Sequence, residues 1–313
     1  MQAVVYTGPQ ELRYQEVDDP HPAPGEVVIA VTACGICGSE LRGVASGSPF
    51  RVPPLIMGHE FTGRRADTGA RVAVNPLVAC LDCDLCLRGQ ANLCRDRVLL
   101  GIQRAGGFAE RVAVPERNLY PVGDDVPAEA GTVVEPLANA IHAWRLPAER
   151  NPQRVGIIGA GTMGLVSLLV ARSRGVPEVE VCDLADERLA VADRLGASRV
   201  GPALGGEYDL VIDAVGVEAT RRDSVARTRP GGSAVWIGLH DEEPGFASLP
   251  FIRLEKAVHG TFCYTHADFE AAIRLAARVD TSWVTTVPLA EGAAVFGELM
   301  RGRSDLLKVQ LVP

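Results

Sequence analysis

The stretch at 154–183, RVGIIGAGTMGLVSLLVARSRGVPEVEVCD, limits the possible folds of this chain more than any other. An apolar run at 154–158 is suited to a buried parallel strand, and it leads into glycines with the spacing G-x-G-x-x-G. Apolar residues at helical spacing follow, and a second apolar run at 179–182 ends in Asp183. The order strand, glycine turn, helix and strand predicts the start of a doubly wound parallel α/β sheet.

Each glycine of this turn has a physical purpose if the ligand is a dinucleotide. Gly159 permits the tight turn, Gly161 lets the backbone approach a pyrophosphate, and Gly164 lets the helix pack closely on its strand. The helix would begin at Thr162 and Met163, where unpaired N–H groups face the phosphates. A flexible glycine turn in some other α/β protein is the alternative, and the flanking strands and helix favour the dinucleotide.

Asp183 points to the kind of dinucleotide. It ends the second strand, where a carboxylate accepts hydrogen bonds from the hydroxyls of the adenosine ribose. The same negative charge repels a 2′-phosphate, so the sequence favours NAD over NADP.

Length and charge exclude several classes of protein. The 313 residues are enough for about two domains, and 47% of them are hydrophobic. A net charge of −8 without any basic run argues against binding to nucleic acid or to an anionic membrane. We find no apolar segment of transmembrane length and no signal-peptide pattern, and we expect a cytoplasmic protein.

The cysteines are expected to be thiols or metal ligands rather than disulfides in such a compartment. Cys80, Cys83, Cys86 and Cys94 have the spacing C-x₂-C-x₂-C-x₇-C, which supplies enough thiolates for a closed tetrahedral zinc site. Iron–sulfur clusters also use C-x₂-C-x₂-C, but in the bacterial ferredoxin run the fourth cysteine follows after three residues and precedes proline. We therefore predict a structural zinc, with unligated thiols as the alternative.

A second set of reactive residue types lies in ACGICGSELRG and MGHEF. Cys37 and His59 are natural ligands for a zinc that keeps one position open for water or substrate, and Ser39 and Glu60 lie beside them in the sequence. Cys34 could form C-x-x-C with Cys37, but we interpret it as a buried small residue at the end of a strand.

The remaining pattern separates a β-rich beginning from a βα repeat. Short β-like runs come first, at 3–6, 12–17, 27–32, 108–114 and 118–122. PAERNP at 147–152 is the best linker candidate. Strands and helices then alternate, with Pro230-Gly231-Gly232 expected to break the chain before a strand at 234–238. The other predicted elements are helices at 187–195 and 267–277 and strands at 208–214 and 256–262.

The order GICGSE, GHEF, C-x₂-C-x₂-C-x₇-C, GGFAE, EPLANAIHA and IGAGTMG resembles the zinc-dependent medium-chain alcohol dehydrogenases, close to the sorbitol and threonine dehydrogenase branch. The resemblance covers nearly the whole chain. It implies a GroES-like, β-rich catalytic domain over residues 1–146, completed by residues 281–313, and a Rossmann NAD-binding domain over residues 147–280.

The resemblance also implies roles for individual residues. Cys37 and His59 would bind the catalytic zinc, and Glu60 would support these ligands or exchange with one of them. Glu135 would occupy the third protein-ligand position, either on the metal or holding its water. Ser39 would take the proton of the alcohol, and capping of a short helix is its alternative role.

The implied reaction is reversible hydride transfer between NAD and a secondary alcohol or its ketone, where the alcohol is a polyol, a sugar-type molecule or a hydroxy amino acid. Arg188 matches the family's basic residue near the adenine ribose, and the family implies a homodimer or homotetramer. L-threonine 3-dehydrogenase is an alternative suggested by QRAGGFAE and NAIHA. A non-catalytic, zinc-stabilised NAD(H)-binding protein is another.

Two positions depart from the family pattern. Glu40 stands where aspartate is usual, and Arg42 stands where many relatives have a histidine that ends the proton relay. Because arginine cannot accept a proton, the proton would leave through water or another group. Arg42 and Arg104 could bind an anionic substrate such as a sugar phosphate or a carboxylate, and contact with solvent or with cofactor phosphates is the interpretation that we favour.

Overall fold

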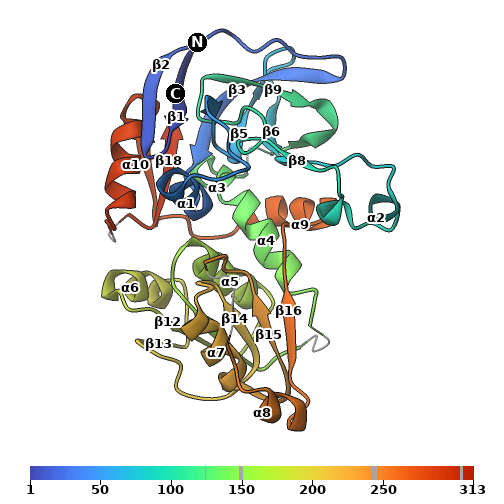
Figure 1. The fold of residues 1–313 in the computed structure, drawn as a ribbon, viewed down its shortest axis with the longest axis vertical. Coiled ribbons are helices and arrows are strands. Elements are labelled where there is room, and N and C mark those ends of the chain that lie inside the picture. Colours follow the sequence, from blue (N-terminus) through green and yellow to red (C-terminus); the bar gives the residue numbers. More distant parts are fainter. Residues whose placement is uncertain (124, 148–150, 241–244, 304–305) are drawn as a thin grey trace. The chain divides into compact units, whose positions relative to one another are not determined.

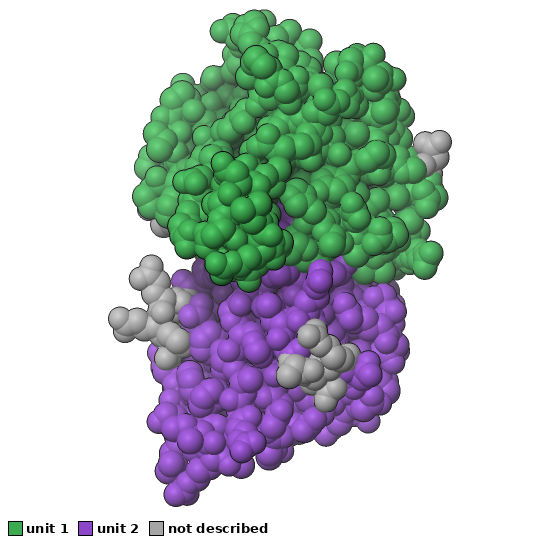
Figure 2. All heavy atoms as spheres, turned by 90° about the vertical axis from the view of Figure 1, so that its right-hand side faces the viewer, with its two compact units in different colours: residues 1–135, 265–313 green, residues 136–264 purple. Residues whose placement is uncertain are grey.

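The computed structural model (Figure 1) describes residues 1–123, 125–147, 151–240, 245–303 and 306–313. Its contacts divide the chain into two compact units, Met1–Glu135 with Thr265–Pro313 and Pro136–Tyr264, which Figure 2 colours separately. The boundaries predicted at 146/147 and 280/281 therefore differ from this division and stay predictions. The predicted linker at 147–152 includes residues 148–150, which lie outside the described residues.

The first unit consists mainly of antiparallel sheets, and the predicted early strands are present. A small sheet in the order β2-β1-β4 contains β1 (Gln2–Gly8), β2 (Glu11–Glu16) and β4 (Leu55–Ile56). A larger sheet in the order β10-β6-β5-β3-β18-β17, with β9 also paired to β3, contains β3 (Glu26–Gly35), β5 (Glu60–Arg65), β6 (Arg71–Val74), β9 (Arg111–Pro115), β10 (Leu119–Pro121), β17 (Val284–Pro288) and β18 (Lys308–Val312).

Short helices and one small antiparallel pair of strands complete this unit. Strand β7 (Leu77–Val78) pairs with β8 (Val98–Leu99). The helical segments are α1 (Gly38–Ser46), α2 (Asp84–Leu87), α3 (Ala128–Gly131), α9 (His266–Ala276), α10 (Gly292–Met300) and the 3₁₀ turns η1 (Ala91–Leu93), η2 (Glu116–Asn118) and η3 (Leu289–Glu291). Helix α4 (Val134–Ala143) runs from the first unit into the second.

The C-terminal strand returns to the sheet that carries the N-terminal motifs. β18 pairs antiparallel with β3, with Leu311 opposite Cys34, and both chain ends lie in this unit (Figure 1). Apolar side chains from both ends of the sequence fill its core, where the rings of Phe108 and Phe296 meet edge to face at 5.8 Å between centroids. The last residues of the chain therefore stabilise the sheet next to Cys37.

The second unit contains a six-stranded parallel sheet within the described residues, in the order β13-β12-β11-β14-β15-β16. This order is that of the dinucleotide-binding doubly wound fold, which reverses direction between its first and fourth strands. Its strands are β11 (Arg154–Ile158), β12 (Glu178–Cys182), β13 (Arg199–Gly201), β14 (Tyr208–Asp213), β15 (Thr228–Trp236) and β16 (Ala257–Gly260).

The helices of this unit follow the predicted βα alternation. They are α5 (Thr162–Ser173), α6 (Asp186–Arg194), α7 (Glu218–Arg227) and α8 (Ser248–Arg253). Across the described ranges of both units, no helix combines the length and the apolar character that a membrane span requires.

One expectation for this sheet was wrong. Pro230, Gly231 and Gly232 do not precede a strand, because β15 begins at Thr228 and contains them. The pairing with β14 jumps from Thr228 to Ser233, so the residues between them bulge out of the ladder. Proline lacks an N–H and glycine tolerates unusual backbone angles, so these residues produce an irregularity inside a strand rather than its beginning.

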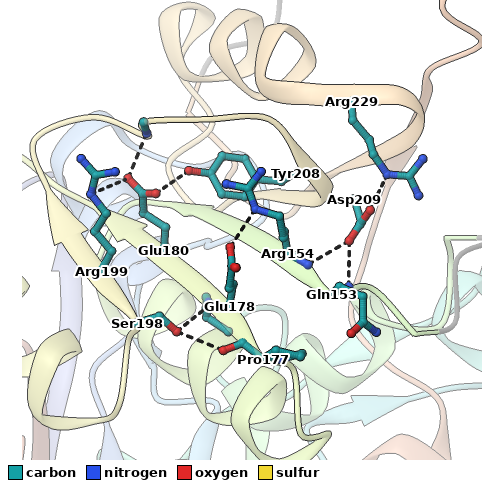
Figure 3. A network of polar contacts seen from close by, with 12 residues as sticks. Gln153, Arg154, Pro177, Glu178, Glu180, Ser198, Arg199, Tyr208, Asp209 and Arg229 are labelled. Atoms are coloured by element: carbon teal, nitrogen blue, oxygen red, sulfur yellow. Dashed lines mark hydrogen bonds and ion pairs between the residues drawn. The ribbon is translucent and has the colours of Figure 1, made fainter.

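Polar side chains join the amino ends of the strands in this unit (Figure 3). The carboxylate of Asp209 accepts hydrogen bonds from the backbone N–H groups of Gln153 and Arg154 at 2.7 and 2.8 Å. The buried Tyr208 hydroxyl donates to Glu180 at 2.6 Å, and burial and this carboxylate raise the pKa of Tyr208 to about 12. The network stabilises the edge opposite to the carboxyl ends of the strands, where ligands of such sheets bind.

Candidate active site and zinc centres

The predicted structural zinc residues come together in a lobe of the first unit. The segment between β7 and β8 carries α2 and η1 (Figure 1), and it brings the Sγ atoms of Cys80, Cys83, Cys86 and Cys94 within 4.8 Å of one another. Sγ of Cys94 lies 3.4 Å from that of Cys80 and 3.9 Å from that of Cys83, and Cys80 and Cys86 are separated by 3.8 Å.

These separations fit one metal ion held by four thiolates. Zn–S bonds of about 2.3 Å in a tetrahedron separate neighbouring sulfurs by about 3.8 Å. A disulfide would instead need two sulfurs at about 2.05 Å. The cysteines of the described residues form no disulfide, and the arrangement suits a closed site without room for substrate.

The second donor set is assembled by the pairing of β3 with β5. These strands are antiparallel, and Gly35 at the end of β3 lies opposite Glu60 at the start of β5. Cys37 lies two residues after the end of β3 and His59 directly precedes β5, so the register places both at the same edge of the sheet. The ligand atoms of Cys37, His59 and Glu60 lie within 4.8 Å of one another, and sulfur, imidazole nitrogen and carboxylate oxygen are all zinc ligands.

Glu40 fixes the imidazole of His59. Its fully buried carboxylate contacts His59 Nδ1 at 2.9 Å and accepts hydrogen bonds from the backbone N–H groups of Gly58 and Cys37 at 2.9 and 3.0 Å. The longer side chain at this position thus still supports the histidine, and Nε2 is left to face a metal. Burial disfavours the charged imidazole, but the Glu40 carboxylate and the sulfur of Cys37 outweigh it and hold the pKa of His59 well above its ordinary value.

Glu60 is held from the other end of the chain. The ammonium group of Lys308 in β18 donates hydrogen bonds to the Glu60 carboxylate and, at 3.1 Å, to the carbonyl of Ile36. Both charged side chains are buried, and the carboxylate overcomes the effect of burial and raises the pKa of Lys308. A Cβ atom at Gly35 would lie 2.5 Å from Glu60 Oε2, so a larger residue there would displace the pair.

Ser39 lies beside Cys37 rather than capping the helix. The N-cap of α1 is Cys37, and Ser39 is in the first turn, where its hydroxyl donates to Cys37 Sγ at 3.4 Å. The same oxygen accepts a hydrogen bond from Arg51 Nη2 at 3.3 Å. Sequence reasoning missed Arg51, because a single arginine in SPFRVPP carries no signal of burial.

Other candidates of the sequence lie outside the donor group. Glu135 is buried in the first turn of α4 and does not belong to the set of mutually close ligand atoms. Arg104 forms an ion pair with Glu26, so a carboxylate of the protein already neutralises it. Arg42 is half-buried on α1, and Cys34 is buried in β3, as predicted.

The glycine turn of the second unit has the geometry expected for a dinucleotide. Gly159 has φ +95°, which favours glycine, and nothing lies within 4 Å of a Cβ built on Gly161, so the backbone there is open to approach. A Cβ on Gly164 would lie 1.7 Å from the carbonyl oxygen of Gly159. Helix α5 begins at Thr162, directly followed by Met163, and its N-terminus follows the carboxyl end of β11.

Asp183 lies beside this turn. Its carboxylate accepts hydrogen bonds from the N–H groups of Ala160 at 2.7 Å and Ala185 at 3.0 Å, and Arg188 Nη1 lies 3.7 Å away. The negative charge is therefore fixed next to the backbone that would hold the pyrophosphate, as the sequence pattern requires for a ribose acceptor.

Known proteins share both parts of this architecture. Residues 23–124 match the family described as alcohol dehydrogenase GroES-like domain, and residues 162–278 match the zinc-binding dehydrogenase family. The chain is 31% identical over 299 residues to L-galactonate-5-dehydrogenase of Escherichia coli K12, covering 88% of this chain and 87% of that protein. The chain belongs to the zinc-binding alcohol dehydrogenase family. The predicted family, fold class and enzyme class are thus confirmed.

Solved structures agree with the fold of this dehydrogenase. A protein described as a short chain alcohol dehydrogenase from E. coli CFT073, complexed with NADH, has a TM-score of 0.92, 25% identity and coverage of 100% of this chain and 99% of that chain. A protein from Sinorhizobium meliloti 1021 that is described as a zinc-binding dehydrogenase, bound to NADP, has the same TM-score and coverage at 27% identity. The dehydrogenase is therefore an NAD(P)-dependent, zinc-containing oxidoreductase of alcohols or polyols.

Proposed function

We propose that this dehydrogenase oxidises a secondary alcohol of a polyol, a sugar-type molecule or a hydroxy amino acid with NAD⁺, and that it catalyses the reverse reduction of the ketone. The observation that carries the proposal is the mixed donor set of Cys37, His59 and Glu60 with the Ser39 hydroxyl beside it. A protein that only binds a cofactor has no need of such a set, because open metal positions serve substrates.

Cys37 and His59 hold the catalytic zinc in this proposal, and Glu60 or Glu135 completes the protein ligands. A bound zinc would supply Lewis acidity, which would make an alcohol at the open position more acidic near neutral pH. Glu40 keeps the ring of His59 in position, and Lys308 balances the charge of Glu60.

Ser39 accepts the proton of the alcohol and passes it on. Its hydroxyl is both a donor and an acceptor, and it lies next to the ligand sulfur of Cys37. Arg42 and Arg51 cannot accept the proton, because a guanidinium group stays charged at working pH. The proton therefore passes from Ser39 to water rather than to the side chain at position 42.

Gly159, Gly161 and Gly164 would hold the cofactor at their turn, and the N–H groups of Thr162 and Met163 at the start of α5 would face its phosphates. Asp183 and Arg188 bind the adenosine ribose. We propose NAD rather than NADP because the negative charge of Asp183 would repel a 2′-phosphate.

Exposed apolar side chains support the proposed homodimer or homotetramer. Leu249 and Ile252 on α8, Leu239 and Phe262 are exposed, and the last two lie close in sequence to the ends of β15 and β16. β16 is an edge strand, which can pair with another chain. Light scattering of the purified protein measures the assembly directly.

Elemental analysis combined with a cofactor-reduction assay tests the proposed function. We expect about two zinc ions per chain, with NADH formed from NAD⁺ and one or more alcohols in a panel of polyols, L-galactonate, threonine and simple secondary alcohols. Cys37→Ser should lose about one zinc and the activity, whereas Cys263→Ser should lose neither, because Cys263 belongs to neither donor set.

A zinc-loaded protein that binds NADH but reduces no NAD⁺ with any alcohol of the panel would overturn the proposal in favour of the non-catalytic alternative. Turnover of threonine alone would identify the threonine dehydrogenase alternative.

A further inference from the structure

The segment between α1 and β4 turns one arginine inward. Phe50 and Val52 are 65% and 71% exposed, whereas Arg51 between them is only 7% exposed. This is the reverse of the usual preference, since charged side chains are normally exposed and apolar ones buried. A buried cation needs a partner of opposite charge. Where the protein supplies no such partner, the position indicates that a ligand supplies it.

Among the described residues, the direct contacts of Arg51 include no carboxylate. Nη2 donates to the neutral hydroxyl of Ser39 at 3.3 Å, and the buried Nε has no hydrogen-bond partner. No carboxylate of the described residues forms an ion pair with Arg51. The guanidinium group packs against α1 at Gly43, where an added Cβ atom would lie 2.8 Å from Arg51 Nη1. The side chain is thus fixed with unused donor capacity beside Ser39.

Arg42 adds a second positive charge to the same neighbourhood. Burial lowers the pKa of Arg42, and the charge of Arg51 lowers it further against the opposite effect of Cys37. The charge of Arg51 also acts on the carboxylate of Glu40, whose oxygens already contact the N–H groups of Cys37 and Gly58 and the ring of His59. The region around Ser39 therefore holds two guanidinium groups and a committed carboxylate.

We propose that Arg51, with Arg42, recognises an oxyanion on the substrate, so that the preferred alcohol is a polyhydroxy acid or a phosphorylated polyol rather than a neutral polyol. This inference rests on the proposed function, because Ser39 marks the position of the reacting alcohol. A guanidinium group binds a carboxylate or a phosphate through paired N–H donors, and such charge-assisted bonds are the stronger ones in proteins.

The test compares three probes with one carbon skeleton: galactitol, L-galactonate and galactitol 1-phosphate. We expect the zinc-loaded enzyme to prefer one of the two anions over galactitol by about 100-fold in kcat/KM, as a charge-assisted hydrogen bond allows. The preferred anion identifies the source as carboxylate or phosphate. Arg51→Gln should reduce this preference at least tenfold, mainly through KM, whereas the matched control Arg13→Gln, an exposed arginine, should retain it.

Calorimetry separates this inference from the proposed function. Titration of the same probes into the enzyme saturated with NADH measures binding without turnover, and it should show the same preference for the anion. If the wild-type enzyme turned over none of the probes, this result would count against the proposed function but not against the anion site. Equal binding of galactitol and both anions, or an unchanged preference in Arg51→Gln, would overturn the anion site.

Two further measurements complete the design. Weaker NADH binding by Arg51→Gln, with substrate preference unchanged, would assign Arg51 to a cofactor phosphate and overturn the inference. If Arg51→Gln does not fold, Arg51→Lys keeps the charge without the paired donors and should lose part of the preference. Gly43→Ala, which displaces the guanidinium group, should then lower the preference in the same direction.

Discussion

Glu40 and His59 are joined by a buried contact of 2.9 Å between a carboxylate oxygen and Nδ1, across nineteen positions of sequence. The carboxylate also accepts hydrogen bonds from the N–H groups of Cys37 and Gly58. One side chain therefore fixes both proposed metal ligands, Cys37 and His59. Such supporting partners set the tautomer and the direction of a metal-bound histidine.

Replacing Glu40 by glutamine tests this arrangement. Glutamine has an NH₂ group in place of one carboxylate oxygen. Because this group donates hydrogen bonds, it cannot accept the hydrogen bond from the N–H of Cys37 or from that of Gly58. We expect the affinity for the catalytic zinc to fall by about 10- to 100-fold, while the zinc of the cysteine lobe remains. Titration with a chromophoric chelator measures both sites, and Glu116→Gln, an exposed glutamate paired with Arg65, is the control. Equal affinity in Glu40→Gln and wild type would contradict this role.

The two zinc sites should differ in how firmly they hold their metal. The lobe of Cys80, Cys83, Cys86 and Cys94 offers four thiolates to one ion, whereas the other set mixes donors and keeps an open position. Chelation should therefore abolish activity before it unfolds the protein. Cys94→Ser should lose about one zinc per chain and expose the segment between β7 and β8 to proteolysis. Unfolding that precedes the loss of activity would show that the order is reversed.

Asp183→Asn should weaken the choice between cofactors. Asparagine keeps an acceptor for the N–H of Ala160 but removes the charge that repels a 2′-phosphate. We expect the ratio of kcat/KM for NAD⁺ over NADP⁺ to fall by about tenfold or more, corresponding to at least 1.4 kcal/mol. Asp186→Asn, at the exposed start of α6, is the matched control. A ratio that does not change would remove Asp183 from the proposed cofactor site.

The sequence predicted the parts of this protein that depend on local pattern. The strand at Arg154–Ile158, the glycine turn and the helix after it lie where the spacing placed them, because the period of apolar residues and the needs of glycine act over a few neighbours. The cysteine lobe was equally predictable from the sequence, because its four cysteines are close in the sequence.

Contacts between segments that are distant in the sequence could not be predicted in this way. The pairing of Lys308 with Glu60 spans 248 positions and depends on the register of β18 against β3. The inward turn of Arg51 depends on the packing of a short segment onto α1, which no periodicity records. Single-sequence reasoning therefore identified the candidate zinc ligands but not the charges that surround them.

The stability of the second unit should depend on pH through Asp209. Burial alone would raise the pKa of this carboxyl, but the N–H groups of Arg154 and Gln153 and the guanidinium group of Arg229 outweigh burial and lower the pKa below its ordinary 3.8. A carboxyl with a lowered folded-state pKa stabilises the fold above its unfolded-state value, and this contribution is lost as the pH falls through the folded-state pKa. Asp209→Asn lacks the contribution at every pH.

We therefore expect Asp209→Asn to reduce the free energy of unfolding by about 1–3 kcal/mol at pH 6, and the difference from wild type to shrink as the pH falls below about 4. Urea unfolding at a series of pH values, followed by tryptophan fluorescence, measures both effects. Asp186→Asn, at the exposed start of α6 in the same unit, should show a smaller difference at pH 6. A difference between Asp209→Asn and wild type that stays constant from pH 6 to pH 3 would mean that the charge of Asp209 does not couple to folding.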